Sequence, residues 1–285
     1  MKICLFNNNR LGVVDGNEAL DVSSVLTRIG TSEYPYPRGD QLIACLPELM
    51  PVIADAIQFA RRYPLSKVTL RSPVANPGKI VAAPVNYQAH LDEAIEDTAT
   101  FSRAHVRKIQ ETGLFLKATS SLVGPDDSVC VDLPDRRTDH EIELVAIIGK
   151  RAKNVLAKDA LSYVAGYSIG LDITIRGPEE RSLRKSLDSY TVLGPWLVTA
   201  DEVENPHALA MTLDVNGKVR QSANTKDLIM DVAELIEFAS KFYTLEPGDL
   251  LYTGTPEGVG PIQPGDTINC EIERIGKISV NVEAS

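Results

Sequence analysis

DHEIELVAIIGK, residues 139–150, is the stretch of sequence that decides the fold. Alternate side chains of a β-strand share a face, so Glu141 and Glu143 point the same way. The residues after Glu143 are apolar on both faces as far as Ile148, a pattern typical of a strand buried inside a sheet. The stretch therefore predicts a buried strand with two carboxylates side by side at its start.

Further strands are predicted on both sides of this one. Short apolar or alternating segments that end in glycine, proline or asparagine are typical of strands joined by turns. Asn216-Gly217 is a strong hairpin signal, because both residue types tolerate the positive φ of a two-residue turn. The predicted strands lie at residues 79–87, 114–124, 128–133, 165–175, 194–200, 209–219, 249–254 and 266–283.

One long helix is predicted among these strands, at residues 226–243. Asn224 or Thr225 is its candidate N-cap, and Asp227 suits the first turn. Five apolar residues recur at helical spacing and predict the face that packs on the core. This stripe consists of Leu228, Val232, Leu235, Ala239 and Phe242.

Residues 1–72 are expected to form a separate small α/β domain. It combines an N-terminal strand with an apolar helical segment at residues 41–63, in which Pro47 and Pro51 are expected to break or restart the helix. The proline-rich stretch RSPVANPGK then indicates a linker. Residues 73–285 form the second, mostly β domain. The strand-rich pattern predicts an α+β, mostly β fold, built as a β-sandwich or rolled sheet.

Composition and charge argue against several classes of function. The net charge of −10 disfavours nucleic-acid binding, which needs a basic face. The 4 cysteines are far apart and form no CxxC pair, as in a protein with reduced thiols. No uninterrupted apolar run approaches the ~18 residues of a membrane span, and the N-terminus lacks a signal-peptide pattern. We therefore expect a soluble cytoplasmic protein without a nucleic-acid or membrane partner.

A third acid joins the two glutamates as a candidate metal ligand. Two like charges at the mouth of a buried strand repel each other unless a cation lies between them. Asp172 stands alone in the apolar pattern of residues 165–175, and a buried acid needs a partner. Three carboxylates suit Mg²⁺ or Mn²⁺, with water completing an octahedron. Solvated acids at a strand end, or an aspartate that caps a turn, are the alternatives.

His90 and Glu93 are candidates for a general base. They are three residues apart, and on a helical turn such residues face each other. A carboxylate beside an imidazole raises its basicity and fixes its orientation, so the pair can activate water. A surface pair on a polar helix is the alternative.

Cations and a glycine-rich loop supply candidate substrate contacts. Arg176, Arg184 and Lys185 follow a predicted strand, and cations there can bind a carboxylate or stabilise an enolate. In YTGTPEGVG, residues 252–260, Thr255 and nearby backbone amides can cradle a carboxylate. Solvated surface cations and a plain turn are the alternatives.

Six pieces of the chain, spread over about residues 78–275, occur in the order of one known family. They are NYQAH with Glu93 after it, DHEIELVAIIGK, GYSIGLDIT, KSLDSYTVLGPWLVT, NGKVRQSANTKDLI and LEPGDLLYTGTPEGVG. By these motifs the chain resembles the fumarylacetoacetate hydrolase family, in its C-terminal catalytic domain. The resemblance implies a mixed β-sandwich roll, an octahedral Mg²⁺ or Mn²⁺ site and usually a homodimer.

The resemblance also assigns roles to residues of this chain. The metal ligands it implies are Glu141, Glu143 and Asp172, the catalytic residues are His90, Glu93 and Lys185, and the substrate contacts are Arg176 and Thr255. Leu171 and Gly177 depart from the family pattern, which often has an asparagine and an acid there. In family members the segment after the histidine acts as a lid, so the resemblance implies one at residues 91–112, and the long segment after Glu93 is expected to reshape the pocket.

The function that follows is metal-dependent hydrolysis of a carbon–carbon bond in an acylpyruvate-like 2,4-dioxo acid, through a pyruvate enolate. His90, paired with Glu93, would activate water, and Lys185 would stabilise the developing oxyanion. The same enolate also serves an oxaloacetate-type decarboxylase, or an isomerase or decarboxylase of 2-hydroxy-diene-dioates in aromatic catabolism. A metal-stabilised binding protein without activity is the alternative from a different class.

Overall fold

The structure is a computed structural model, and it describes residues 1–96 and 109–285. The lid expected at residues 91–112 falls mostly on residues 97–108, outside the described ones. Its described flanks are helices α2 (Gln88–Glu96) and α3 (Ile109–Thr112). The lid therefore stays a prediction.

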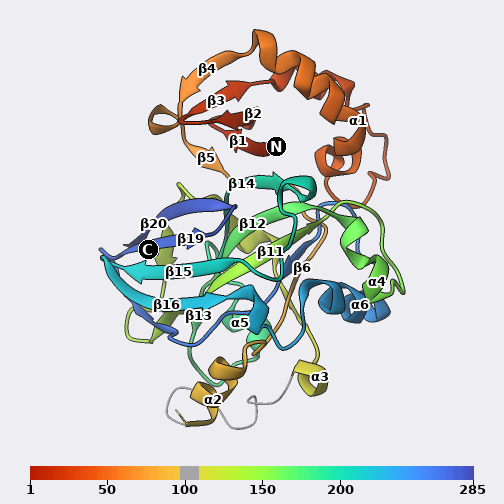
Figure 1. The fold of residues 1–285 in the computed structure, drawn as a ribbon. Coiled ribbons are helices and arrows are strands. Elements are labelled where there is room, and N and C mark those ends of the chain that lie inside the picture. The colour runs from red at the N-terminus through yellow and green to blue at the C-terminus, as the bar shows by residue number, and fades with distance from the viewer. Residues whose placement is uncertain (97–108) are drawn as a thin grey trace.

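A large mixed sheet runs through the molecule (Figure 1). Its strands are β1 (Lys2–Phe6), β2 (Arg10–Asp15), β3 (Glu18–Asp21), β4 (Arg61–Pro64), β5 (Leu70–Arg71), β6 (Ile80–Ala82), β7 (Phe115–Lys117), β8 (Leu122–Val123), β11 (Ile142–Ile148), β12 (Val164–Asp172), β14 (Thr191–Thr199) and β17 (Leu250–Tyr252). Within the described residues their order is β4-β3-β2-β1-β14-β12-β11-β17-β6-β7, with β5 beside β1 and β8 beside β14. Neighbours are antiparallel, except that β6 runs parallel to β17 and β8 to β14.

Two smaller sheets complete the β-structure of the described residues. One has the order β16-β15-β19-β20-β9 and the other β13-β10-β18. Their strands are β9 (Val129–Val131), β10 (Thr138–His140), β13 (Thr174–Ile175), β15 (Ala210–Val215), β16 (Lys218–Asn224), β18 (Gly260–Ile262), β19 (Thr267–Ile272) and β20 (Gly276–Ala284). The β15–β16 hairpin turns at Asn216-Gly217, whose φ angles are 54° and 78°, so the hairpin prediction is confirmed.

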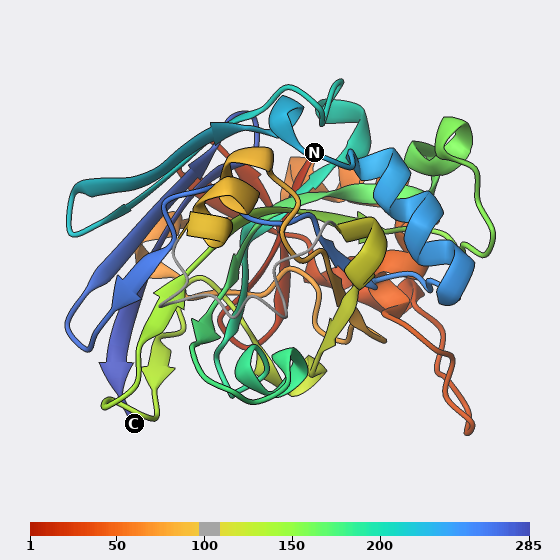
Figure 2. The same cartoon turned by 90° about the horizontal axis from the view of Figure 1, so that it is seen from below.

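Short helices and turns surround the sheets. Helix α6 lies beside α4 along one side of the large sheet (Figures 1 and 2). Besides α2 and α3, the helices are α1 (Gln41–Ala56), α4 (Ala157–Ala160), α5 (Arg181–Arg184) and α6 (Val232–Phe242). The 3-10 turns are η1 (Ser23–Arg28), η2 (Ile57–Phe59), η3 (Leu65–Lys67), η4 (Thr119–Ser121), η5 (Leu161–Tyr163), η6 (Ala200–Glu202) and η7 (Thr225–Asp227).

Strand β11 lies between two hydrophobic cores, and all of its residues are buried. Val145 and Ile147 belong to the core that contains α1 and the N-terminal strands. Leu144 and Ala146 belong to the core that contains α6 and the five-stranded sheet. The predicted buried strand is confirmed, and so is the α+β, mostly β fold. Glu143 lies on the same face of β11 as Val145 and is buried near the start of the strand.

The N-terminal residues share the large sheet with the rest of the chain. Strand β1 pairs antiparallel with β14, with Ile3 opposite Leu197. Side chains of β1, β2 and α1 also lie in the same core as those of β11 and β14. The division into domains at residues 1–72 and 73–285 stays a prediction, and the two parts are joined by one sheet and one core.

Helix α1 corrects the expectation for the prolines. It runs without a break through Pro47 and Pro51. Each proline removes one backbone N–H donor, but both are exposed, while Ile43, Leu49 and Ile53 on the other side of the helix pack into the core. This apolar stripe also includes Leu46, and its burial stabilises the helix by more than the lost hydrogen bonds destabilise it. The segment Gln41–Phe59 is also long and apolar enough to cross a membrane by length and composition alone.

Helix α6 corrects the expectation for residues 226–243. It begins at Val232, because Asp231 and Glu234 form a capping box at its N-terminus. Asn224 instead caps the short turn η7, and Leu228 forms a β-bridge with Tyr87. Phe242, expected in the core, is exposed. The D-x-x-E pattern before the apolar run was the local signal for the true start.

Candidate active site

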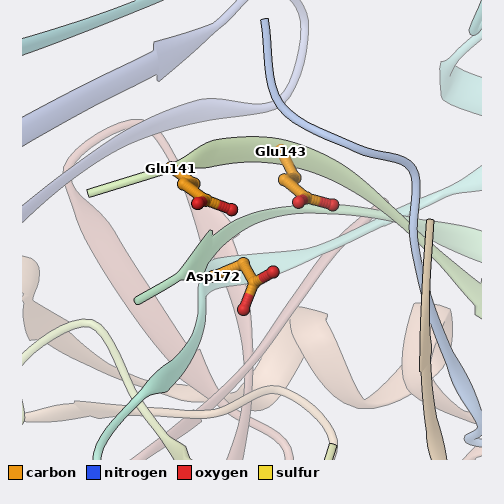
Figure 3. Close-up of side chains that lie close together, drawn as sticks. All are labelled: Glu141, Glu143 and Asp172. Carbon is orange, nitrogen blue, oxygen red and sulfur yellow. The ribbon is translucent and has the colours of Figure 1, made fainter. Parts of the chain in front are cut away.

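The three candidate metal ligands meet where β11 and β12 pair (Figure 3). Glu143 is the second residue of β11, Glu141 directly precedes that strand, and Asp172 ends β12. Asp172 N donates to Glu141 O at 2.9 Å, so the pairing continues to the level of the acids. One oxygen from each carboxylate lies within 4.8 Å of the others, and all three side chains are buried.

Burial makes these carboxylates electrostatically unequal. Burial raises the pKa of Glu143 well above its usual range, and the charge of Asp172 raises it further. Burial also acts to raise the pKa of Glu141, but Lys185 and Arg176 outweigh it and bring that pKa down to about 2. Glu143 Oε2 accepts a hydrogen bond from Gly254 N at 2.7 Å, a weaker compensation than a cation provides. A negative charge on Glu143 is therefore less well compensated than one on Glu141.

Lys185 lies among the same acids. Its Nζ donates to Glu141 Oε2 at 2.7 Å, to Asp172 Oδ2 at 2.6 Å and to Thr174 Oγ1 at 2.6 Å. An ammonium has three donors, so these bonds occupy all of them. In this structure Lys185 compensates the charge of the carboxylates. A bond to a substrate oxyanion requires it to release one of these partners.

Lys117 is a second buried lysine at the site, and the sequence analysis did not identify it. Its Nζ forms an ion pair with Asp172 and donates to Tyr190 O at 2.9 Å. Burial lowers the pKa of Lys117, although Asp172 acts in the opposite direction. The available signal was a single lysine inside the predicted strand segment LFLKATSS, because a lysine in a buried strand needs an acidic partner.

Arg176 contacts a candidate metal ligand directly. Its Nε donates to Asp139 Oδ2 at 2.7 Å, and an Nη donates to Glu141 Oε1 at 3.1 Å. Asp139 is fully buried and also accepts from Arg137. The structure thus brings Arg176 to the site, where it orients Glu141. Its contact with substrate stays a prediction.

His90 and Glu93 form the expected pair on α2. His90 Nδ1 lies 2.8 Å from Glu93 Oε2. His90 is buried, and it is close enough to Glu141 to contribute to lowering the pKa of that carboxyl. Glu93 Oε1 accepts from the backbone N of Gly258 at 3.0 Å. The pair therefore lies within electrostatic range of Glu141 and also ties α2 to the glycine-rich loop at residues 252–260.

Gln221 holds that loop against β11, a role that sequence reasoning missed. Its Nε2 donates to Thr255 Oγ1 at 2.8 Å and to Pro256 O at 2.9 Å. Its Oε1 accepts from Ile142 N at 3.1 Å and lies 3.3 Å from His140 Nδ1. Gln221 is the fully buried residue of a mostly exposed strand, β16. The sequence of that strand therefore gave little indication that Gln221 is buried. Thr255 is buried beside Gln221. Its neighbour Gly254 donates its backbone N–H to Glu143, so Thr255 also lies near that carboxylate.

The donor set fits a hard divalent cation. Carboxylate oxygens are the ligands that Mg²⁺ and Mn²⁺ prefer, and three of them converge here from two paired strands. An ion bound among them would supply a positive charge, and this charge would compensate the buried carboxylate of Glu143. With a histidine–glutamate pair beside it, this arrangement can bind an anionic oxo acid and activate a water molecule.

Known proteins resemble this chain along its length. The family model described as "Fumarylacetoacetate (FAA) hydrolase C-terminal" matches residues 79–283. Maleylpyruvate hydrolase of Aquipseudomonas alcaligenes is 56% identical over 286 residues, covering 100% of both chains. The mitochondrial oxaloacetate tautomerase Fahd2a of Rattus norvegicus is 37% identical over 78% of this chain and 74% of its own length.

A solved structure has the same fold. Maleylpyruvate hydrolase of Sphingobium sp. SYK-6, in complex with manganese(II) and pyruvate, is 40% identical to this chain and superposes with a TM-score of 0.85 over 100% of both. The family model covers well over half of the chain, and it spans the three carboxylates, His90 and Glu93. The chain therefore belongs to the fumarylacetoacetate hydrolase family.

Proposed function

We propose that this chain hydrolyses maleylpyruvate, or a closely related acylpyruvate, to pyruvate and the corresponding carboxylic acid. The observation that carries the proposal is the buried trio Glu141, Glu143 and Asp172 beside the paired His90 and Glu93. The maleylpyruvate hydrolase that is 56% identical over the whole chain supports the choice of substrate.

Glu141, Glu143 and Asp172 are the proposed ligands of the divalent ion. Manganese is supported by the solved relative that holds manganese(II) with pyruvate, and Mg²⁺ has the same preference for oxygen ligands. The ion, when bound, supplies positive charge that stabilises the enolate oxygen of the departing pyruvate. Lys117 and Arg176 fix Asp172 and Glu141, so the ligands are held in place before substrate binds.

His90 is the proposed general base. Glu93 accepts the proton on Nδ1, which leaves Nε2 as the basic nitrogen. Nε2 takes a proton from water while the water oxygen bonds to the carbonyl carbon of the acyl group. The bond from that carbon to the pyruvate methylene then breaks, and its electron pair forms the enolate. The enolate takes up a proton at the methylene carbon, which gives pyruvate.

Lys185, Arg176 and Thr255 are the proposed substrate-side groups. Lys185 can stabilise the oxyanion once it releases one of its three present acceptors. Thr255 follows Gly254, whose N–H donates to Glu143, and Thr255 with the amides of its loop suits a carboxylate of the substrate. Arg176 is the third proposed substrate contact, and it also donates a hydrogen bond to Glu141 at 3.1 Å.

The proposal is tested with metal-stripped protein to which Mn²⁺ or Mg²⁺ is returned. Loss of maleylpyruvate is followed by absorbance, and pyruvate is measured with a coupled dehydrogenase. We expect activity to vanish with the metal and to return with it. His90→Gln should lower kcat by about 100-fold or more. His207→Gln is the matched control, since His207 also pairs with an acid, Asp231, outside the site, and it should keep wild-type turnover.

Tautomerisation of oxaloacetate is the second candidate, supported by the relative that is an oxaloacetate tautomerase. It needs proton transfer without an attacking water. Full turnover of maleylpyruvate by metal-stripped protein would contradict the metal role. Conversion of oxaloacetate, without pyruvate release from maleylpyruvate, would replace hydrolysis by tautomerisation, and release of carbon dioxide would indicate the decarboxylase.

We also propose that the protein is a cytoplasmic homodimer with a small 2-oxo acid as its binding partner. The net charge of −10 supports the absence of a nucleic-acid partner. Light scattering after gel filtration tests the dimer, and a flotation assay with lipid vesicles tests for membrane binding through α1. The proposed domain boundary near residue 72 is supported by the start of the family match at residue 79.

A further inference from the structure

Arg181, the first residue of α5, is a half-buried cation that the site described so far does not use. Its guanidinium carbon lies 5.4 Å from the centre of the Phe115 ring, over its face. Within the described residues no hydrogen-bond acceptor or ion-pair partner is recorded for it. A guanidinium held on an aromatic face, with its N–H donors available, is a common arrangement for binding an anion.

The neighbouring arginines differ from Arg181 because their guanidinium groups have hydrogen-bond acceptors. Arg176 is engaged by Asp139 and Glu141. Arg184 donates to the backbone oxygens of Glu179 and Ile175. Burial, and then repulsion from Arg184, lower the pKa of Arg181, and the more distant charges of Glu141, Asp172 and Glu180 compensate this only in part. None of the described acids forms an ion pair with Arg181, so the compensation of its charge is incomplete. An arriving anion would supply that compensation.

Arg181 also lies close to Lys185, the lysine that holds two of the carboxylates. Lys185 Nζ, which holds Glu141 and Asp172, lies 5.4 Å from the centre of the same Phe115 ring. The two cations are therefore at most twice that distance apart. The charges of Glu141 and Asp172 act on Arg181 as well, which agrees with its position at the rim of the site.

The proposed substrate has an anionic group at this range. Maleylpyruvate carries one carboxylate at its pyruvate end and a second at the end of its acyl arm. Six carbon–carbon bonds of ~1.5 Å separate the two carboxyl carbons, so an extended molecule spans less than ~9 Å. If the pyruvate end lies at the acids and Lys185, the distal carboxylate lies within the range at which Arg181 stands.

We propose that Arg181 binds the distal carboxylate of the acyl arm and makes the enzyme selective for dicarboxylic acylpyruvates over neutral ones. This inference rests on the proposed hydrolase function. The contact is remote from the bond that breaks, so it contributes to binding of substrate and transition state alike. Its loss should therefore appear in KM rather than in kcat.

The test compares maleylpyruvate with acetylpyruvate, whose acyl arm ends in a methyl group. For Arg181→Gln with Mn²⁺ we expect kcat/KM on maleylpyruvate to fall by about 10- to 100-fold, the range for one charge-assisted hydrogen bond. The value for acetylpyruvate should change by less than about 3-fold. Arg181→Lys should lie between, because it keeps the charge but loses the planar fork. Arg151→Gln is the control, since Arg151 is exposed and pairs with Glu246.

The outcomes separate this inference from the function on which it rests. Equal losses on both substrates, or no loss on either, would overturn the role of Arg181 while the hydrolase stands. If the wild type does not turn over acetylpyruvate, its inhibition constant is measured instead and should be the same in Arg181→Gln. The melting temperature of Arg181→Gln should not fall, whereas a structural role would lower it. A wild type inactive on maleylpyruvate would overturn the hydrolase itself, and this inference with it.

Discussion

Replacing Gln221 with methionine tests how the glycine-rich loop is held against β11. Methionine has a similar length and volume but neither donates nor accepts a strong hydrogen bond. The change removes the bonds to Thr255 Oγ1 and Pro256 O, the bond from Ile142 N and the contact with His140 Nδ1. All four of these contacts are buried, so water does not readily replace the lost partner.

The expected cost follows from which groups lose their partner. The hydroxyl of Thr255 can rotate toward another acceptor, but the N–H of Ile142 and the C=O of Pro256 are fixed by the backbone. Leaving a buried polar group unsatisfied costs about 1–3 kcal/mol, so two such groups cost about 2–6 kcal/mol. Since domains have about 5–15 kcal/mol of stability, this is a large fraction. Thr255 should also lose its position, which would raise KM for maleylpyruvate.

The assay is equilibrium unfolding in urea, followed by far-UV circular dichroism, with the metal removed so that ligand binding does not contribute. Gln263→Met is the matched control, because Gln263 is exposed, and it should change the free energy of unfolding by less than about 0.5 kcal/mol. A loss below about 1 kcal/mol for Gln221→Met would refute the reasoning, since the loop would then be held by other contacts.

Two further predictions concern the same loop and the carboxylates. A Cβ on Gly258 would lie 2.1 Å from Arg220 O, whereas one on Gly217 meets nothing within 4 Å, although both glycines have a positive φ. Gly258→Ala should therefore cost more free energy of unfolding than the ~1 kcal/mol expected for Gly217→Ala, and equal values would show that the loop can shift. Glu143→Ala should abolish Mn²⁺ binding in isothermal titration calorimetry together with hydrolysis, because it removes one of three ligands. Unchanged metal affinity in Glu143→Ala would show that Glu143 is not a ligand.

The sequence correctly predicted those elements and contacts that depend only on residues close together in the chain. The apolar run after Glu143 identified β11 as a buried strand, because such a run leaves both faces of the strand apolar and both must be covered. Asn216-Gly217 predicted its hairpin through the φ that those residues tolerate. The spacing of His90 and Glu93 predicted a contact that a single helical turn makes.

Other elements were mispredicted where local signals compete. The apolar stripe before Val232 suggested an earlier helix start, but the capping box at Asp231 and the bridge from Leu228 to Tyr87 decided it. The prolines in α1 suggested a break, but burial of Ile43 and Ile53 keeps the helix continuous. In each case a contact with another part of the chain changed the balance between two local preferences.

The sequence by itself determined which side chains could do chemistry here: two acids with strand spacing, a lone acid in another predicted strand, and a histidine with a glutamate one helical turn away. The tertiary structure alone decided that Lys117 lies against Asp172, that Gln221 ties the loop to β11, and that Arg181 stands over Phe115 with no acceptor among the described residues. The physical reason is that these contacts join residues far apart in the chain. Spacing predicts neighbours within one element, whereas burial and charge compensation depend on which elements pack together.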